Sequence, residues 1–242
     1  MGDFLDPNNK ERLMASHINN FPYLQIAKHY EHCFDKHGPT NQGVDWPNLT
    51  DLNKRFRVMT DIILLPLGVC LPAGPGGTGK KSLLDFGCGP ALLLDWLKED
   101  GRIQFVDYSG CDISDKFISF CKTKDPTVNF FQIDAIQHPE NLPEYDYAVM
   151  NGVLTLKAGL SFDEMWEFAQ KLITNVFQKS KQGISFNLMS KQVDWERDDL
   201  FHVPLDLLAN FVTKQLTRHF VIRNDYGLYE YTVYLYKHPQ YR

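Results

Sequence analysis

The stretch that decides the fold runs from Leu83 to Ala91 and reads LLDFGCGPA. An apolar run, residues 82–86, is stopped by a Gly-x-Gly turn, and the spacing over 91–99 is that of a helix. This order of strand, glycine turn and helix is typical of a doubly wound α/β sheet, whose ligands bind beside such turns. The backbone at Gly87 and Gly89 can approach a ligand closely because neither residue has a side chain.

Strand-like and helix-like segments alternate through the rest of the chain, which predicts a mostly parallel sheet with helices on both faces. We expect strands over 104–112, 128–133, 145–150 and 184–188, helices over 163–177 and 205–216, and a closing pair of strands over 220–223 and 229–236.

The residues before this alternation are organised differently. Helical apolar spacing is interrupted by a turn-rich stretch, residues 37–48, so we expect an N-terminal helical cap or lid over residues 1–72. Residues 73–81 (AGPGGTGKK) predict a glycine-rich linker, and residues 82–242 the ligand-binding domain. Gly74–Lys80 also fits the G-x-x-x-x-G-K pattern of a phosphate-binding loop. That interpretation is disfavoured because Lys81 stands where a Ser or Thr is needed, and a strand follows where a helix should begin.

Composition excludes several classes of function. The chain has 242 residues and a formal net charge of −5, so no global basic field attracts nucleic acid, and we expect no nucleic-acid partner. Its five cysteines are scattered and form no C-x-x-C pair, which predicts reduced thiols, a cytoplasmic location and no metal site. The N-terminus lacks a secretory pattern, and no apolar stretch reaches the roughly 20 residues of a membrane span. We therefore expect a soluble protein without membrane contact.

Three aspartates end consecutive predicted strands, namely Asp85, Asp112 and Asp134. Because the carboxyl ends of parallel strands meet at one edge of a sheet, these carboxylates are expected to line one crevice. They suit a ligand rich in hydrogen-bond donors, such as ribose hydroxyls, an exocyclic amine and an ammonium group. Taken singly, each aspartate could instead be a helix N-cap or a turn residue.

The sequence here resembles the class I S-adenosylmethionine-dependent methyltransferases, of the type that act on small molecules. The resemblance lies in LLDFGCGPA (83–91), GCDIS (110–114), FFQIDA (130–135) and YDYAVMNGVL (145–154). It implies a seven-stranded Rossmann-like sheet with an antiparallel last strand, and S-adenosylmethionine as cofactor. One departure is Ala91, where the family often has a third glycine. The chain also has Met-Asn-Gly-Val at 150–153, where nucleic-acid and glutamine methyltransferases have an Asp/Asn-Pro-Pro-aromatic tetrad.

The resemblance also implies roles for single residues. Asp85, Gly87 and Gly89 would hold the methionine end, Asp112 the ribose, Asp134 and Ala135 the adenine, and Asn151 with Gly152 would lie under the methyl donor. Cys88 and Ile113, which adjoin these residues, are also expected to bind the cofactor. From the cap we predict Arg57, rather than Arg55, as the clamp on the methionine carboxylate, with an acidic substrate as the alternative partner. We predict that Tyr30 closes over the cofactor, with core packing as the alternative.

Methyl transfer from a sulfonium is an in-line displacement on an activated carbon, so positioning and the exclusion of water supply much of the catalysis. A general base is not essential. If one acts, the candidates are His37, Asp194, Glu196 and His202, of which the two histidines are the catalytic residues that we predict. For the acceptor we predict contacts from Trp46, Asp194 and Trp195, with anchoring of its own loop as the alternative for Trp195.

These observations predict a methyltransferase that acts on a small or medium-sized metabolite. A nicotinamide-dependent oxidoreductase is disfavoured because Asp85 lies in the turn, where it would repel a pyrophosphate, and because no tyrosine–lysine pair for hydride transfer is evident. A third interpretation is a non-catalytic module that binds a cofactor or a partner on the same fold.

Overall fold

The predicted glycine turn follows the carboxyl end of β1 (Lys81–Phe86), an inner strand of one mixed sheet, and precedes helix α4 (Leu92–Glu99). The computed structural model describes residues 21–64 and 79–240. Residues 1–20 and 65–72 of the predicted cap, and residues 73–78 of the predicted linker, lie outside the described residues. From the N-terminal side the elements are α2 (Leu24–His37), η1 (Gln42–Val44), α3 (Leu49–Leu64), β1 (Lys81–Phe86), α4 (Leu92–Glu99), η2 (Arg102–Phe105), β2 (Val106–Asp112) and α5 (Asp115–Lys124). They continue with β3 (Asn129–Gln132), η3 (Pro139–Asn141), β4 (Tyr145–Met150), α6 (Phe162–Lys179), β5 (Ser180–Ser190), β6 (His202–Val203), α7 (Leu205–Gln215), β7 (Phe220–Arg223) and β8 (Glu230–Tyr236).

The strand order confirms the predicted fold class. The sheet runs β3-β2-β1-β4-β5-β8-β7, and the two-residue strand β6 pairs with β5 beside this path. Strands β1 to β6 pair in parallel, whereas β8 is antiparallel to β5 and to β7. The last strand is therefore the antiparallel one, as expected. The sequence did not indicate β6, because two residues carry no periodicity to detect.

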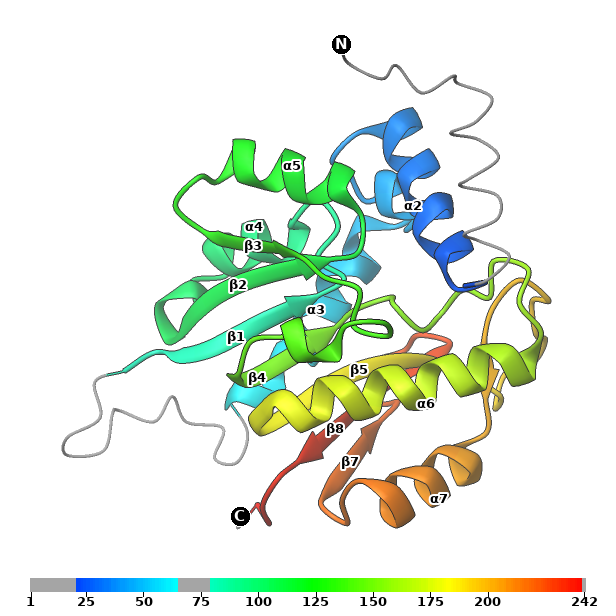
Figure 1. The fold of residues 1–242 in the computed structure, drawn as a ribbon. Helices are drawn as coiled ribbons and strands as arrows, with labels where there is room; N and C mark the ends of the chain where they lie inside the picture. The colour runs from blue at the N-terminus through cyan, green and yellow to red at the C-terminus, as the bar shows by residue number, and fades with distance from the viewer. Residues whose placement is uncertain (1–20, 65–78, 241–242) are drawn as a thin grey trace.

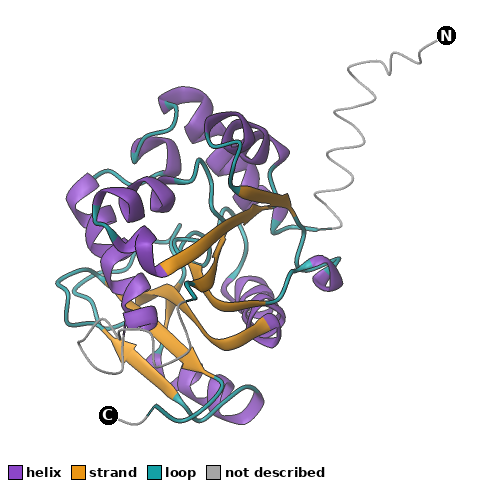
Figure 2. Cartoon of the chain, turned by 90° about the vertical axis from the view of Figure 1, so that its left-hand side faces the viewer, coloured by secondary structure: helices purple, strands orange, loops and turns teal. Residues whose placement is uncertain are grey.

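Helices cover both faces of the sheet (Figures 1 and 2). The alternation of side chains along β1 sends Leu84 to the face that packs against α6 and α7, and Leu83 to the face that packs against α3, α4 and α5. Both leucines are 1% exposed, because a central parallel strand is covered on each side. The carboxyl ends of the parallel strands remain as the place where a ligand can enter.

The described part of the predicted cap divides into two portions. Helix α3 packs on the sheet itself, where the Ser185 hydroxyl donates to the Met59 carbonyl over 2.9 Å and Leu52 is 1% exposed. Helix α2 and the turn that follows it lie instead beside the carboxyl ends of the strands (Figure 1). None of the described helices combines the length and the apolar character needed to cross a membrane.

Gly183 in β5 is a position where the fold requires glycine. A Cβ there would collide with the backbone carbonyl oxygen of Leu235 in β8, and a backbone atom cannot rotate away. We expect Gly183→Ala to lower the free energy of unfolding by about 1–3 kcal/mol, the usual cost of overpacking. Urea denaturation measures this change. Gly79→Ala, where a Cβ meets nothing within 4 Å, is the control, and an equal effect of the two variants would contradict the assignment.

Candidate functional site

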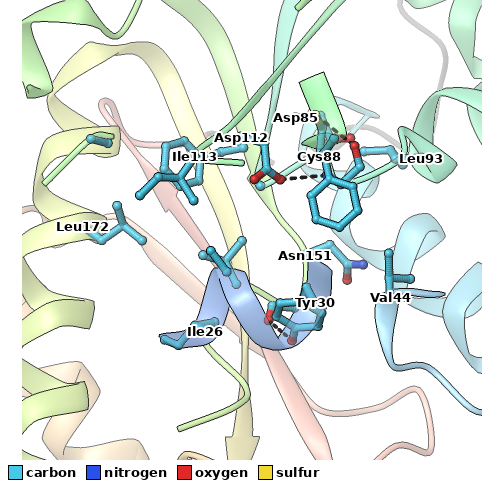
Figure 3. A pocket seen from close by; sticks show the side chains of 18 of the residues that line it. Ile26, Tyr30, Val44, Asp85, Cys88, Leu93, Asp112, Ile113, Asn151 and Leu172 are labelled. Atoms are coloured by element: carbon cyan, nitrogen blue, oxygen red, sulfur yellow. Dashed lines mark hydrogen bonds between the residues drawn. The ribbon is translucent and has the colours of Figure 1, made fainter. Parts of the chain in front are cut away.

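A first cavity of about 140 Å³ lies where β1, β2 and β4 end, and α2 closes its open side (Figure 3). The glycine turn forms one wall, with φ of +72° at Gly87 and +50° at Gly89. A Cβ at Gly87 would lie 2.5 Å from the Cγ2 atom of Val153, so only glycine fits this position. Among the residues that line the cavity are Tyr30, Asp85, Gly87, Cys88, Gly89, Asp112, Ile113, Asp134, Ala135, Asn151 and Gly152, all predicted for the cofactor.

Asp85 is a buried carboxyl group at the end of β1. It is 3% exposed, and the Tyr108 hydroxyl donates a hydrogen bond of 2.7 Å to its Oδ2 atom. Burial raises the pKa of Asp85 to about 7, although the bond from Tyr108 acts in the opposite direction. The carboxylate therefore lacks a full compensating partner within the protein.

Asp112 ends β2 and holds the glycine turn. Its Oδ2 accepts a hydrogen bond of 2.9 Å from the Gly89 amide, and its Oδ1 accepts one of 2.9 Å from the Ser114 amide. Burial still raises the pKa of Asp112 to about 6, since the two amides offset only part of the cost of desolvating the charge.

All charged residues that line the first cavity, among those that the structure describes, are acidic. Three aspartates contribute to its lining, and no lysine, arginine or histidine is among the described residues that do so. Carboxylates held in a poorly solvated place without cations favour a positively charged ligand and repel a phosphate. This sign of charge separates a sulfonium or ammonium ligand from a nucleotide di- or triphosphate.

Asp134 follows β3 and is more constrained than expected. Its Oδ1 accepts from the Ile136 and Gln137 amides over 2.9 and 3.1 Å, and its Oδ2 accepts from the Tyr23 hydroxyl and the Gln137 side chain, each over 2.7 Å. The four lone pairs of the carboxylate are thus in use. The expected bond from an adenine amine requires one of these bonds to be exchanged. Tyr23 belongs to the cap, so Asp134 also joins the cap to the sheet.

The loop after β4 presents an unpaired acceptor. The Oδ1 atom of Asn151 is buried and has no hydrogen-bond partner in the described part of the chain. The neighbouring Gly152 has φ of +77°, and its amide donates to the Asn187 side chain over 2.8 Å. A buried acceptor without a partner costs about 1–3 kcal/mol. A donor group of a ligand would remove that cost.

A second cavity of about 600 Å³ adjoins the first. Tyr30 and Trp46 line both cavities and so form a common wall. The Tyr30 hydroxyl donates to the Gly152 carbonyl over 3.3 Å, which fixes this side chain at the boundary. The second cavity is also lined by Arg55, Thr155, Met189, Trp195, His202 and Tyr229.

Arg55 and Glu230 form a buried ion pair beside this second cavity. The Arg55 Nε atom donates to Glu230 Oε2 over 2.8 Å, and the two residues are 9% and 1% exposed. The Arg55 guanidinium also lies 3.9 Å from the ring centre of Trp46, within the range of a cation–π contact. The ion pair therefore fixes the guanidinium that contacts Trp46 and so stabilises the common wall.

The predicted clamp, Arg57, does not fit this geometry. Its Nη2 atom donates to Asp100 over 3.0 Å, its side chain is 61% exposed, and it does not line either cavity. Residues two apart on a helix cannot share a face, and it is Arg55 that points inward. No local signal could have favoured Arg55 over Arg57, because the partner that buries Arg55, Glu230, is 175 residues away in sequence.

The predicted catalytic histidines, His37 and His202, both line the second cavity but differ in exposure and in hydrogen bonding. His37 is exposed at the end of α2. His202 is 6% exposed, with its Nδ1 atom 2.6 Å from the Ser190 carbonyl and its Nε2 atom 3.3 Å from the Arg197 amide. A neutral ring that donates from Nδ1 and accepts at Nε2 satisfies both contacts. His202 therefore anchors the loop 191–201, and neither ring nitrogen is free to act as a base.

Of the three predicted substrate residues, two line the second cavity and one lines neither cavity. Trp46 and Trp195 line the second cavity, and Trp195 is 64% exposed at its mouth. Asp194 is exposed and is not among the residues that line either cavity. Neighbouring residues in this loop point in different directions, so Asp194 does not share the place of Trp195.

Sequence reasoning missed three buried polar residues of the site, Tyr108, Asn187 and Glu230. A signal existed for Glu230, because it is the single charged residue in an otherwise apolar strand over 229–236, and a lone buried charge needs a partner. No comparable signal marks Tyr108, since a tyrosine in a strand usually reflects packing alone.

Comparison with known proteins agrees with this geometry. Residues 84–174 match the family model described as a methyltransferase domain. A protein of Mycobacterium tuberculosis, provisionally named a methyltransferase, is 29% identical over 156 residues, which make up 63% of this chain and 90% of that protein. Over residues 84–174 the chain therefore carries a methyltransferase domain.

Solved structures with the same fold include other methyltransferases. The magnesium protoporphyrin IX methyltransferase of Synechocystis PCC 6803, solved with bound S-adenosylmethionine, has a TM-score of 0.51 and 11% identity, and the match covers 98% of this chain and 100% of that one. A TehB-like S-adenosylmethionine-dependent methyltransferase of Corynebacterium glutamicum has a TM-score of 0.53 and 13% identity, over 87% of this chain and 100% of that one. At these identities the likeness establishes the fold of the methyltransferase domain and nothing about its acceptor.

The ion pair beside the second cavity makes a testable contribution to stability. Glu230→Gln keeps the size of the side chain but leaves the Arg55 charge buried without its counter-ion, so we expect the free energy of unfolding to fall by about 3–5 kcal/mol. Guanidinium denaturation measures the loss. Glu144→Gln removes a carboxylate that is 72% exposed and pairs with Lys181 at the surface, and it should change stability by less than about 0.5 kcal/mol. Equal stabilities of the two variants would show that the buried pair is not needed.

Proposed function

We propose that this methyltransferase transfers the methyl group of S-adenosylmethionine to a small or medium-sized metabolite held in the second cavity. One observation carries the proposal: an anionic cavity at the strand ends shares the wall of Tyr30 and Trp46 with a larger cavity of different composition. When bound, the cofactor supplies an activated methyl group on a positively charged sulfur.

The residues of the first cavity fit this cofactor. Asp112 is suited to accept from ribose hydroxyls, and Asp85 offers an uncompensated carboxylate near the glycine turn for the positive charge. Asn151 offers its unpaired Oδ1 to an ammonium or amine donor. The adenine end of the cofactor would be bound by the backbone of Ala135 and by Asp134, whose carboxylate also accepts a hydrogen bond from Tyr23.

The chain's own contribution to catalysis is positioning. Tyr30 and Trp46 fix the boundary between the cavities and exclude water from it, which favours an in-line displacement. With both nitrogens of His202 engaged, the protein offers no buried base at this boundary among the predicted candidates. Of the other candidates, Asp194 and Glu196 are exposed and line neither cavity, and Glu196 pairs with Lys191 over 3.0 Å. His37, exposed at the rim of the second cavity, is the candidate base that we retain.

The second cavity supports a partly aromatic acceptor. Its volume of about 600 Å³ lies within the range of about 300–1,000 Å³ that is usual for small-molecule sites. Tyr30, Trp46, Trp195 and Tyr229 offer rings, and Arg55 adds a cation whose charge Glu230 already balances. A cytoplasmic location belongs to the same proposal. It is supported by the free thiols of the four described cysteines, Cys33, Cys88, Cys111 and Cys121.

Ligand-dependent thermal unfolding tests the assignment of the first cavity. S-adenosylmethionine at about 100 times its dissociation constant should add ~2.7 kcal/mol and raise Tm by roughly 2–4 °C. S-adenosylhomocysteine should also raise Tm, whereas NAD and ATP should not, because the three aspartates repel phosphates. Asp112→Asn should abolish the shift without unfolding the protein, and Asp107→Asn, an exposed change in the same strand, should retain it. A shift with NAD or ATP alone would overturn the proposal, and cofactor binding without turnover of any acceptor would favour a non-catalytic module.

The raised pKa values of Asp85 and Asp112 predict how cofactor affinity depends on pH. Both carboxyls lose their protons between about pH 5 and 7.5, and a positively charged ligand favours the ionised forms, so binding releases protons. Affinity should therefore rise with pH over this range, by up to about tenfold per pH unit for each proton released. In the absence of ligand the sign is reversed, because the folded protein holds these protons more tightly than the unfolded chain, and stability falls as pH rises from about 4 to 7.

Calorimetric titration with S-adenosylmethionine at three pH values, in buffers of different ionisation enthalpy, measures both affinity and proton release. Asp85→Asn should reduce the slope to that of a single group. An affinity that is independent of pH in the unmodified protein would contradict the role of the two carboxyls.

A further inference from the structure

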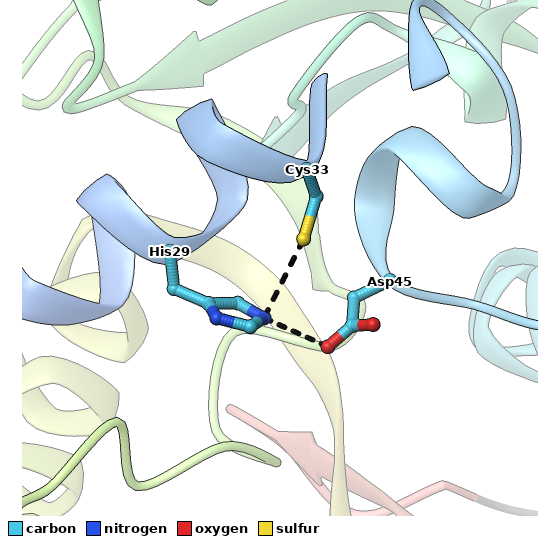
Figure 4. A group of neighbouring side chains, drawn as sticks. All are labelled: His29, Cys33 and Asp45. Atoms are coloured by element: carbon cyan, nitrogen blue, oxygen red, sulfur yellow. Dashed lines mark hydrogen bonds and ion pairs between the residues drawn. The ribbon is translucent and has the colours of Figure 1, made fainter. Parts of the chain in front are cut away.

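A cluster of three metal-ligating side chains lies in the cap, apart from the acidic cavity. His29 and Cys33 come from α2, and Asp45 comes from the turn after η1. One ligand atom from each residue lies within 4.8 Å of the other two, and Figure 4 shows the three side chains converging. The sequence predicted no metal site because the cysteines lack C-x-x-C spacing. That criterion detects sites with paired cysteines and misses a site made of one histidine, one cysteine and one aspartate.

The backbone brings these side chains together without help from an ion. His29 and Cys33 are four residues apart on a helix and so share one face. Asp45 adopts a left-handed conformation, with φ of +59°, in a turn that is closed by hydrogen bonds between Asn41 and Trp46. A Cβ at Gly43 would collide with the Gly38 carbonyl, so the turn is tightly packed. The site is therefore largely preformed.

Two of the three separations between ligand atoms are close to those around a tetrahedral ion, and the third is at most 4.8 Å. The His29 Nε2 atom lies 2.8 Å from Asp45 Oδ2 and 3.6 Å from Cys33 Sγ. Zinc bond lengths of about 2.0 Å to nitrogen and oxygen and about 2.3 Å to sulfur place tetrahedral ligands about 3.3 Å apart for N–O and about 3.6 Å apart for N–S. The N–S separation already fits, and the N–O pair needs to open by only about 0.5 Å.

We propose that His29, Cys33 and Asp45 form a binding site for Zn²⁺ that fastens α2 to the turn 38–48. Thiolate and imidazole ligands suit zinc, whereas Mg²⁺ and Ca²⁺ prefer oxygen ligands throughout. On binding, the Cys33 thiol releases its proton to solvent. His29 also gives up to solvent the Nε2 proton that faces Asp45 in the metal-free protein and keeps or takes up one proton on Nδ1, so that Nε2 is free to bind. One thiolate and one carboxylate neutralise the two charges of the ion. The fourth position is left for water.

Metal binding would act on the methyltransferase site through the common wall. Tyr30 follows His29 directly and Trp46 follows Asp45 directly, and both side chains line the two cavities. Without metal, the contact between His29 and Asp45 joins side chains that are 37% and 52% exposed, and such exposed pairs add little stability. An ion would turn this weak contact into a firm restraint on the wall. The inference does not depend on methyl transfer, since binding of the metal is itself the readout.

Titration of the untagged, reduced full chain with Co²⁺ tests the site, because Co²⁺ replaces zinc and gives an absorption band when a thiolate binds it. We expect one equivalent to bind with a thiolate band, and Zn²⁺ to displace it. Cys33→Ser should remove the band. His29→Gln and Asp45→Asn should each weaken binding by more than the roughly 10–100-fold that loss of an outer-shell partner costs.

Three variants serve as matched controls that should leave binding unchanged. Cys70→Ser tests one of the other four thiols, the remaining three, Cys88, Cys111 and Cys121, being buried, and His32→Gln and Asp35→Asn change exposed residues of α2. A second readout is hydrogen exchange, in which Zn²⁺ should slow the amides of residues 41–46 in the unmodified chain and not in Cys33→Ser. The proposal is overturned if no thiolate band forms, if the band survives Cys33→Ser, or if the control variants weaken binding as much as the ligand variants. Circular dichroism of each variant establishes that a lost band reflects a lost ligand in a folded protein.

Discussion

The hydrogen bonds between the end of β2 and the glycine turn after β1 are the interaction on which the rest of the structure depends. The Cys111 carbonyl accepts from the Gly87 and Cys88 amides over 2.8 and 3.0 Å, and the Asp112 carboxylate accepts from the Gly89 amide. These bonds bend the chain sharply at the carboxyl edge of the sheet, which opens the first cavity. They also draw a carboxylate into a place where water solvates it poorly. The fold therefore forms its site by burying negative charge that the protein itself does not neutralise.

The cap completes this arrangement with two kinds of contact. Helix α3 is held by the sheet, since the Tyr234 hydroxyl donates to the Val58 carbonyl over 2.5 Å and Arg55 pairs with Glu230. Helix α2 is held at its start by Tyr23, which bonds to Asp134 and stacks on Phe168 with ring centres 5.1 Å apart. The helices that carry Tyr30 and, through Arg55, support Trp46 are thus held by contacts with residues distant in sequence, among them Asp134, Glu230 and Tyr234.

Local patterns predicted most of the fold. Strand β4 has the bounds that alternation and burial indicated, and β7 and β8 form the expected closing pair, with β8 one residue shorter at its start. Helix α6 begins near the predicted position because Ser161 and Glu164 form a capping box. Strand β5 is longer than predicted, because Ser180 and Gly183 do not stand out as strand formers yet pair with Tyr145 and Tyr147 of β4, on either side of a shift in register. The site was less predictable where it depends on partners distant in sequence: nothing near Arg55 indicates Glu230, and nothing near Asp134 indicates Tyr23.

Ala91 shows how narrow the range of acceptable residues is at the start of α4. It is fully buried and has φ of +58°, a conformation that costs an L-residue roughly 1–2 kcal/mol. Burying its methyl group returns about 0.8 kcal/mol of that cost, so alanine is tolerated where the family often has glycine. A larger side chain would incur the same backbone cost at a position that is already fully buried. Substitution at this position is therefore restricted to residues that tolerate a positive φ and occupy little volume.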